Sequence, residues 1–166
     1  NLKAQGGDKS ITISWDSVAG ATDYEIYKAD INSDDYRLLA TVSKDELSYS
    51  DRAVSAGVPY SYIVRAKGEA LTSLASDVLN AEYLDAPVIS KISSEYGGVN
   101  ITWNKVTGAE EYLICLKIGN GKWETIDSVE GTVSTYFDEC AENGETSYYA
   151  IKARSEYGIS DINEKV

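Results

Sequence analysis

The sequence predicts an all-β chain that folds as two tandem seven-stranded β-sandwiches. Apolar and polar residues alternate with a period of two along most of its 166 residues, and β-branched and aromatic residues occupy the apolar phase. One stretch also occurs twice, because residues 11–27 match residues 99–115, with Trp15 at the position of Trp103 and Tyr24 at that of Tyr112. The offset of 88 residues, from 15 to 103, leaves two units that are each long enough to build a core.

The first unit shows its strands in sequence order. The chain begins inside an expected first strand, and in the next one Ile11, Ile13 and Trp15 alternate with Thr12 and Ser14, which gives one buried and one solvent-facing side. Polar, turn-rich segments separate the later strands. After the turn at Gly20 we expect strands around Tyr24 and Ile26, over 36–42, over 47–51, over 60–66 and over 74–83.

The second unit repeats this order and fixes the boundary. Its expected strands cover 88–93, 99–103, 111–118, 123–129, 134–138, 147–154 and 159–166. From the fourth strand on, the offset falls to 87, as Asp51 and Asp138 show, so one residue is missing from the preceding loop. Pro87 cannot donate to a ladder and suits the start of an edge strand. We therefore expect domains at 1–84 and 85–166, joined by a very short linker that restricts them to an elongated tandem.

Charge and composition exclude several classes of partner. The 15 Lys and Arg against 27 Asp and Glu give a net charge of −12, which repels phosphate backbones, so no nucleic acid partner is expected. No apolar run approaches the ~20 residues of a membrane-spanning helix, so no membrane insertion is expected. Cys115 and Cys140 lack equivalents in the first unit, which argues against a disulfide framework. The absence of Met, with a start inside a strand, indicates a piece of a longer polypeptide.

Each unit resembles a fibronectin type III domain, especially the divergent form found in tandem in large secreted and surface proteins of Gram-positive bacteria. The resemblance covers nearly the whole chain. It implies an immunoglobulin-like sandwich, a non-catalytic role, and an extracellular location, either secreted or attached to the cell surface. The residues that carry it are the second-strand Trp, the third-strand Tyr-x-Ile and the sixth-strand Gly-x-x-Tyr-x-Tyr-x-Val-x-Ala: Trp15, Trp103, Tyr24, Ile26, Tyr112, Ile114, Gly57, Tyr60, Tyr62, Val64 and Ala66.

The resemblance also predicts a tyrosine corner in the first unit, where the Tyr60 hydroxyl should bond back to the preceding corner. The second unit departs from the pattern, because Ser147 stands at this position and is too short. Either Tyr148 replaces it through a strand shift, or the second unit lacks a hydrogen bond worth about 1 kcal/mol.

The residue types argue against catalysis and against a cofactor. The chain has no histidine, which removes Ser-His-Asp and Cys-His arrangements and the commonest zinc ligand. Carboxylates are plentiful, but no pair occupies neighbouring inward positions, so we interpret them as solvated surface groups. Asp30, Asn32 and Asp34 match three ligand positions of a calcium loop, yet Asp35 replaces its glycine and Thr41 its bidentate Glu. The alternatives are a hydrated turn and a weak partial calcium site.

The second unit carries a candidate partner surface. On the outward phase of its third and sixth strands lie Leu113, Cys115, Tyr148 and Ala150, which would form a small exposed apolar patch. The alternative is that a neighbouring segment or the adjoining domain covers them. Trp123 stands at a strand start, where it either packs or stacks on a sugar ring. We expect Cys115 to be an ordinary free thiol, because no basic residue adjoins it.

The function that the resemblance implies is a spacer. The two domains would orient and present neighbouring modules of a larger secreted or surface-anchored bacterial protein, with adhesion-type contacts. The expected partners are neighbouring domains of the same polypeptide and a surface protein or polysaccharide. The alternative is a carbohydrate-binding or host-protein-binding accessory module attached to a glycoside hydrolase or another extracellular enzyme.

Overall fold

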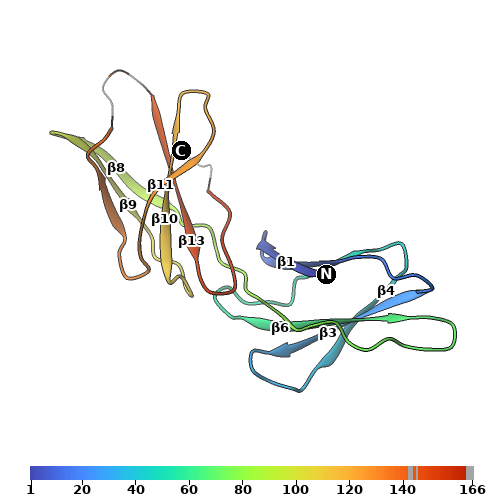
Figure 1. The fold of residues 1–166 in the computed structure, drawn as a ribbon. Coiled ribbons are helices and arrows are strands. Elements are labelled where there is room, and N and C mark those ends of the chain that lie inside the picture. Colours follow the sequence, from blue (N-terminus) through green and yellow to red (C-terminus); the bar gives the residue numbers. More distant parts are fainter. Residues whose placement is uncertain (142–143, 145, 164–166) are drawn as a thin grey trace. The chain divides into compact units, whose positions relative to one another are not determined.

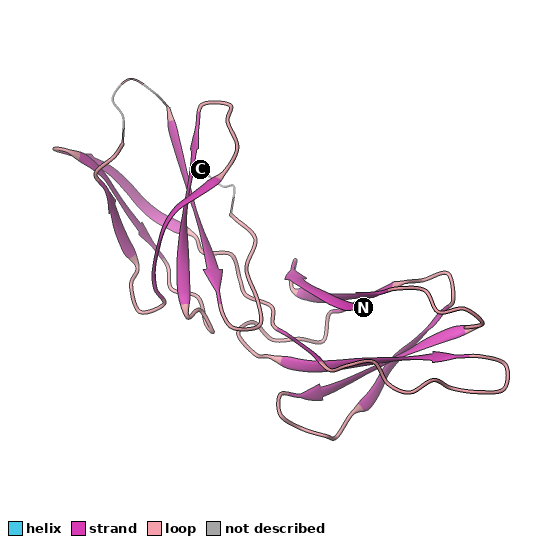
Figure 2. Cartoon of the chain, in the orientation of Figure 1, coloured by secondary structure: helices cyan, strands magenta, loops and turns pink. Residues whose placement is uncertain are grey.

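The computed structural model describes residues 1–141, 144 and 146–163. The chain divides into two compact units, Asn1–Tyr83 and Leu84–Val166, and each is described here by itself. All regular structure in the described residues is β-strand, as Figures 1 and 2 show. Within these residues no helix is long and apolar enough to cross a membrane.

The first unit is a sandwich of two antiparallel sheets (Figure 1). The three-stranded sheet has the order β1-β2-β5, with bounds Leu2–Gly7, Ser10–Trp15 and Ser48–Asp51. The four-stranded sheet has the order β4-β3-β6-β7, with bounds Arg37–Ser43, Asp23–Asp30, Tyr60–Lys67 and Leu79–Ala81. The seven strands expected from the sequence are therefore present.

The second unit repeats this plan. One sheet has the order β12-β9-β8, with bounds Thr135–Asp138, Gly98–Trp103 and Ile89–Glu95. The other has the order β11-β10-β13, with bounds Glu124–Glu130, Glu111–Ile118 and Ser147–Arg154. Tyr112 lies opposite Ala153, as Tyr24 lies opposite Ala66, so the repeat in sequence is also a repeat in strand register.

The repeated Trp and Tyr residues form the centre of each core, as their spacing predicts. The ring centroids of Trp15 and Tyr24 are 5.5 Å apart in the first unit. The equivalent rings, Trp103 and Tyr112, are 5.4 Å apart. These distances and tilted geometries are those that aromatic pairs favour.

The tyrosine hydroxyls explain why the Trp-x-x-Val-x-Gly-Ala-x-x-Tyr run occurs twice. The Tyr24 hydroxyl accepts a hydrogen bond of 2.8 Å from the backbone N–H of Val18. The backbone N–H of Ala21 donates to the Val18 carbonyl, which closes a turn with Gly20 at φ 80°. Val106 and Tyr112 repeat the first bond at 2.7 Å. Tyrosine therefore holds the turn that leads into its own strand.

The strand expected over 74–83 is correct only for Leu79–Ala81. Before it, Ser73 bonds Ala66 of β6 with its backbone N–H as donor (2.8 Å) and its hydroxyl oxygen as acceptor (3.0 Å). Ser76 bonds Val64 in the same way, at 2.9 and 3.0 Å. Ser73 and Ser76 are three residues apart, whereas their partners Ala66 and Val64 are two apart. This mismatch breaks the period-two register of a strand.

The last strand expected for the second unit is shortened for the same reason. Ser160 makes the equivalent pair of bonds with Ala153, at 2.8 and 2.9 Å. Ile159 forms an isolated bridge with Arg154, and the described residues 160–163 form no strand. The rest of that expected strand, 164–166, lies outside the described residues.

The tyrosine corner of the first unit is present, because the Tyr60 hydroxyl accepts a 3.3 Å hydrogen bond from the Ser55 N–H. In the second unit Ser147 lies opposite Ile118, in the register that Tyr60 has opposite Asp30. The alternative of a strand shift that brings in Tyr148 is therefore wrong. Parts of the corner before Ser147 lie outside the described residues.

Candidate interaction surfaces

The residues expected to form a partner surface lie on and beside the β11-β10-β13 sheet. Leu113 and Cys115 belong to β10, and Tyr148 and Ala150 to β13, where Cys115 pairs directly with Ala150. Trp123 precedes β11 by one residue. The fold thus brings the four strand residues onto one face, as their outward phase predicts.

The expectation of an exposed apolar patch is wrong at three positions. Leu113 is 9% exposed, Cys115 2% and Ala150 1%. Both β10 residues lie on the central strand, between β11 and β13, and the Cys115 sulfur lies 3.8 Å from the Thr125 hydroxyl oxygen of β11. Small side chains in the middle of a sheet are covered by their neighbours. Alternation in sequence gives the face of a residue but not this coverage.

The accessible part of the face is an aromatic group around Lys117; the sequence pointed to Trp123 and Tyr148 but not to this lysine. The Lys117 ammonium lies 5.0 Å from the ring centroid of Trp123 and 4.8 Å from that of Tyr148. All three side chains are half-buried. Among the described residues, no carboxylate lies within ion-pair distance of Lys117. Two cation–π contacts therefore hold this ammonium, each of about 0.5–1 kcal/mol at such an exposed site.

The corresponding face of the first unit pairs its polar groups internally. Glu25 accepts a 2.9 Å hydrogen bond from the Tyr27 hydroxyl, and this bond raises the pKa of Tyr27 above its usual range. The Lys67 ammonium lies 3.3 Å from the same carboxylate, and the Arg65 guanidinium lies over the Tyr27 ring. This arrangement leaves little for a ligand to bind.

A buried carboxylate in each unit is a second feature that the sequence reading missed. Asp51 accepts hydrogen bonds from the Tyr62 hydroxyl (2.9 Å), the Ala53 N–H (2.9 Å) and the Lys28 ammonium (2.7 Å). Burial, followed by the Asp51 charge, raises the pKa of Tyr62 well above its usual range. The matching positions of Asp51 with Asp138 and of Tyr62 with Tyr149 were visible in the repeat, but their contact was not.

The second unit keeps the buried carboxylate but has no lysine at the position of Lys28. Asp138 accepts bonds from the Tyr149 hydroxyl (2.6 Å) and the Cys140 N–H (2.9 Å). Leu116 faces Tyr149 across the strands, as Lys28 faces Tyr62. Asp138 is therefore a buried carboxylate held by neutral donors, an arrangement that stabilises structure through hydrogen bonds and does not resemble a catalytic pair.

The remaining candidates are the calcium-like loop and the two cysteines. In the described residues no group of three or more acidic, cysteine or histidine side chains is placed to hold a metal ion. In the loop proposed for calcium, Asp35 pairs with Arg37 at 2.7 Å, and Asn32 adopts a positive φ of 60°. Cys115 and Cys140 are free thiols, the first buried and the second exposed.

The strand order decides the fold family. In an immunoglobulin constant domain the fourth strand extends the A-B-E sheet, whereas here β4 pairs with β3, and β11 likewise pairs with β10. Both units have the fibronectin type III fold. Their tryptophans, Tyr-x-Ile pairs and sixth-strand tyrosines occupy the positions that the resemblance in sequence predicts.

Solved structures similar to this chain include several fibronectin type III proteins. A two-domain segment from chicken tenascin is 14% identical, with a TM-score of 0.49, over 98% of this chain and 94% of that one. The FN1–FN3 domains of chicken CNTN1 are 17% identical, with a TM-score of 0.47, over 99% and 61%. A Fn3-like protein from Clostridium thermocellum is 24% identical, with a TM-score of 0.46, over 50% and 88%. No protein-family model and no curated protein matches the chain.

Proposed function

We propose that the chain is a pair of non-catalytic spacer modules in a larger secreted or surface-anchored bacterial protein. Each module would fix the distance and orientation of the modules attached to it. The extracellular, bacterial setting follows from the resemblance in sequence.

The path of the chain through the first unit is the observation that carries this proposal. The chain enters β1 at Leu2, which pairs with Trp15. It leaves at Tyr83, whose carbonyl accepts a 2.9 Å hydrogen bond from the Gly57 N–H, beside the far end of β1 at Gly6. Chain ends at opposite ends of a rigid sandwich separate whatever is attached to them.

The surface composition also supports a spacer. Asp and Glu exceed Lys and Arg in both halves, which favours solubility and discourages self-association. Trp, Tyr and aliphatic side chains fill the centre of both cores, as in the non-catalytic sandwich that the resemblance in sequence implies.

Retention on candidate surfaces tests the spacer function. The 166-residue chain would be applied to insoluble polysaccharides, bacterial cell walls and immobilised matrix proteins, with and without calcium. A spacer elutes with the void fraction from all of them. Saturable retention on one surface would contradict a purely spacing role.

The aromatic group around Lys117 favours a second candidate, a binding module for polysaccharide or a surface protein. Half-buried Trp123 and Tyr148 rings beside the Lys117 ammonium, which has no carboxylate partner among the described residues, resemble the stacking and polar groups that hold sugars. If a polysaccharide retains the chain, Trp123→Ala should abolish retention. Phe137→Ala, which removes a partly exposed ring from the other sheet, is the matched control. Equal retention of both variants would exclude this face.

A further inference from the structure

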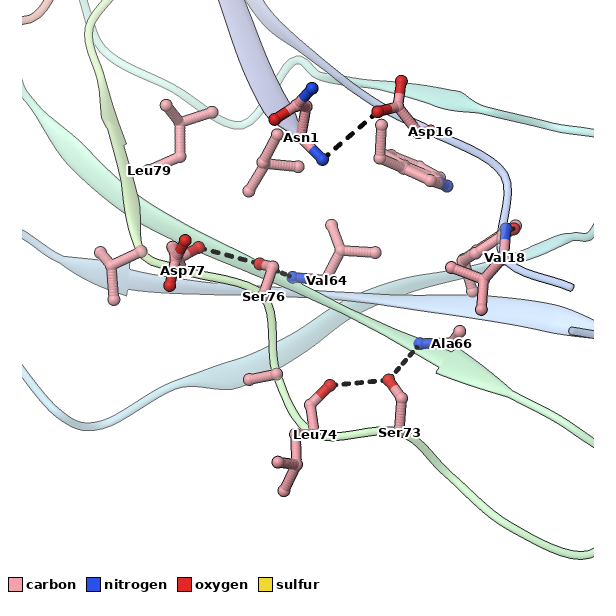
Figure 3. A pocket seen from close by; sticks show the side chains of 15 residues that line it. Asn1, Asp16, Val18, Val64, Ala66, Ser73, Leu74, Ser76, Asp77 and Leu79 are labelled. Carbon is pink, nitrogen blue, oxygen red and sulfur yellow. Dashed lines mark hydrogen bonds and ion pairs between the residues drawn. The ribbon is translucent and has the colours of Figure 1, made fainter.

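The first unit contains a hollow that opens beside its three-stranded sheet. It has a volume of about 450 Å³, within the range of about 300–1,000 Å³ typical of ligand pockets. The floor consists of core residues Trp15, Tyr24, Val64 and Ala66. Figure 3 shows the opening between Asp16 on one side and the segment from Ser73 to Leu79 on the other, with Val18 at one end.

The serine-bonded segment that departs from a regular strand forms one side of the hollow. Ser73 and Ser76 take their bonds from β6 through hydroxyl oxygens, and the residues between them therefore do not continue the apolar alternation that would close the core. In Figure 3 the dashed lines from Ala66 to Ser73 and from Val64 to Ser76 mark these bonds, and the other line at each serine runs to the carbonyl of the next residue.

The equivalent floor positions of the second unit are less exposed. Trp15 and Ala66 are each 8% exposed, whereas Trp103 is 2% and Ala153 0% exposed. Val64 at 7% compares with Ile151 at 1%. These floor residues are buried in both units, and they are slightly more exposed in the first.

The rim of the hollow is apolar and acidic. Leu74 is 93% exposed, and Val18 and Val78 are also exposed, which is unusual for aliphatic side chains gathered at one opening. Asp77 and Asp16 stand at the same rim, and Asp16 lies 3.4 Å from the amino group of Asn1. The Asn1 ammonium is a cation at this rim, and no lysine or arginine is among the described residues that line the hollow.

We propose that this hollow binds an apolar side chain from a basic segment of a partner protein. The apolar side chain would rest on Trp15, the more exposed of the two floor rings, and the flanking Lys or Arg residues would face Asp16 and Asp77. A small molecule in the hollow would leave the exposed rim of Leu74 and Val78 in water, whereas a polypeptide segment covers both floor and rim. The acidic rim, in a unit with an excess of Asp and Glu, selects a basic segment by charge complementarity.

The test titrates three capped peptides into the isotopically labelled full chain and follows binding by NMR. The first peptide is Lys-Lys-Gly-Phe-Gly-Lys-Lys, the second has Ala in place of Phe, and the third has Glu in place of every Lys. The first should shift the indole N–H signal of Trp15 and the amide signal of Ala75. The second and third should bind at least tenfold more weakly, because one lacks the anchor and the other meets like charge.

Matched variants place the binding at the hollow. Leu74→Asp at the rim should weaken the first peptide at least tenfold, whereas Leu71→Asp, 82% exposed but outside the lining, should change affinity less than twofold. Asp77→Lys should weaken binding and Asp45→Lys should not. Both leucines are exposed, so neither substitution disturbs folding.

Three results would overturn the proposal. One is the absence of binding by the first peptide. Another is equal binding of the three peptides, or equal effects of Leu74→Asp and Leu71→Asp. The third is a concentration-dependent dimer in sedimentation that Leu74→Asp abolishes, which would assign the hollow to a second copy of this chain.

Discussion

The Lys28 ammonium lies 2.7 Å from the Asp51 carboxylate, and the two side chains are 16% and 1% exposed. Lys28 also donates to the Ala53 carbonyl at 2.7 Å and lies 3.8 Å from the ring centroid of Tyr60. One lysine thus joins β3, the end of β5 and the tyrosine corner of the first unit. The second unit has Leu116 at this position.

Replacing Lys28 should therefore destabilise the first unit alone. Lys28→Leu leaves Asp51 buried without a cation, and we expect the free energy of unfolding to fall by about 3 kcal/mol. Urea unfolding followed by the amide signals of β3 measures this change. Lys67→Leu is the control, because its ion pair with Glu25 is more exposed and should contribute less than about 1 kcal/mol. Equal effects of the two variants would contradict the role of Lys28.

Stability should fall at high pH because of the two buried tyrosines. Burial and the hydrogen bonds to Asp51 and Asp138 raise the pKa of Tyr62 and Tyr149 above the ordinary value of 10.0. Below that pH both residues are protonated in the folded and the unfolded chain, so their contribution is constant. Above it the unfolded chain releases protons that the folded chain keeps, and the free energy of unfolding falls by up to about 1.4 kcal/mol per pH unit for each tyrosine.

Urea unfolding between about pH 9 and 11 measures this slope. Tyr62→Phe should remove the part of this slope that comes from the first unit. It should also lower the free energy of unfolding at neutral pH by about 1 kcal/mol, because the hydrogen bond to Asp51 is lost. A variant whose slope equals that of the unchanged chain would show that Tyr62 ionises equally in both states.

The hydroxyl of Tyr24 should stabilise the turn at Val18. Tyr24→Phe keeps the ring in the core and removes only the 2.8 Å bond, so we expect a loss of about 1 kcal/mol. Tyr112→Phe should have the same effect in the second unit. The fully exposed Tyr96 serves as control, since Tyr96→Phe removes a hydroxyl that only water contacts. Thermal unfolding that does not distinguish the three variants would contradict this account.

The two thiols should differ in reactivity. Cys140 is exposed and should react with a disulfide reagent in the native chain, whereas Cys115 is buried and should react only after unfolding. The stoichiometry is therefore one thiol in buffer and two in denaturant. Cys140→Ser should remove the native reaction entirely. Rapid labelling of Cys115 in that variant would mean that the centre of the outward face is open after all.

The sequence was sufficient to predict the fold and the core. Period-two alternation and a repeated stretch define two sandwiches, because both signals depend on residues close together in the chain. Trp15, Tyr24 and their counterparts in the second unit lie in the cores as predicted. The Tyr60 corner also follows from a local pattern combined with a family resemblance.

The surfaces were harder to predict, since coverage depends on residues far apart in sequence. Cys115 and Ala150 lie on the expected face but are covered by their neighbours. The contact between Asp51 and Lys28 joins positions 23 residues apart, and nothing local marks it. The hollow beside Trp15 is lined by Ser73 and Ser76, whose hydroxyl oxygens accept bonds from β6, although in the sequence they resemble ordinary polar positions of a strand.

The most direct test of the spacer account is to stretch the full chain between its two ends in a single-molecule pulling experiment. Two self-contained sandwiches should unfold in two separate events. Each should release about 250 Å, since about 80 residues extend by about 3.3–3.6 Å each and the folded length is subtracted. One event of twice that length would contradict two independent modules, and extension without a distinct event would contradict a spacer that bears load.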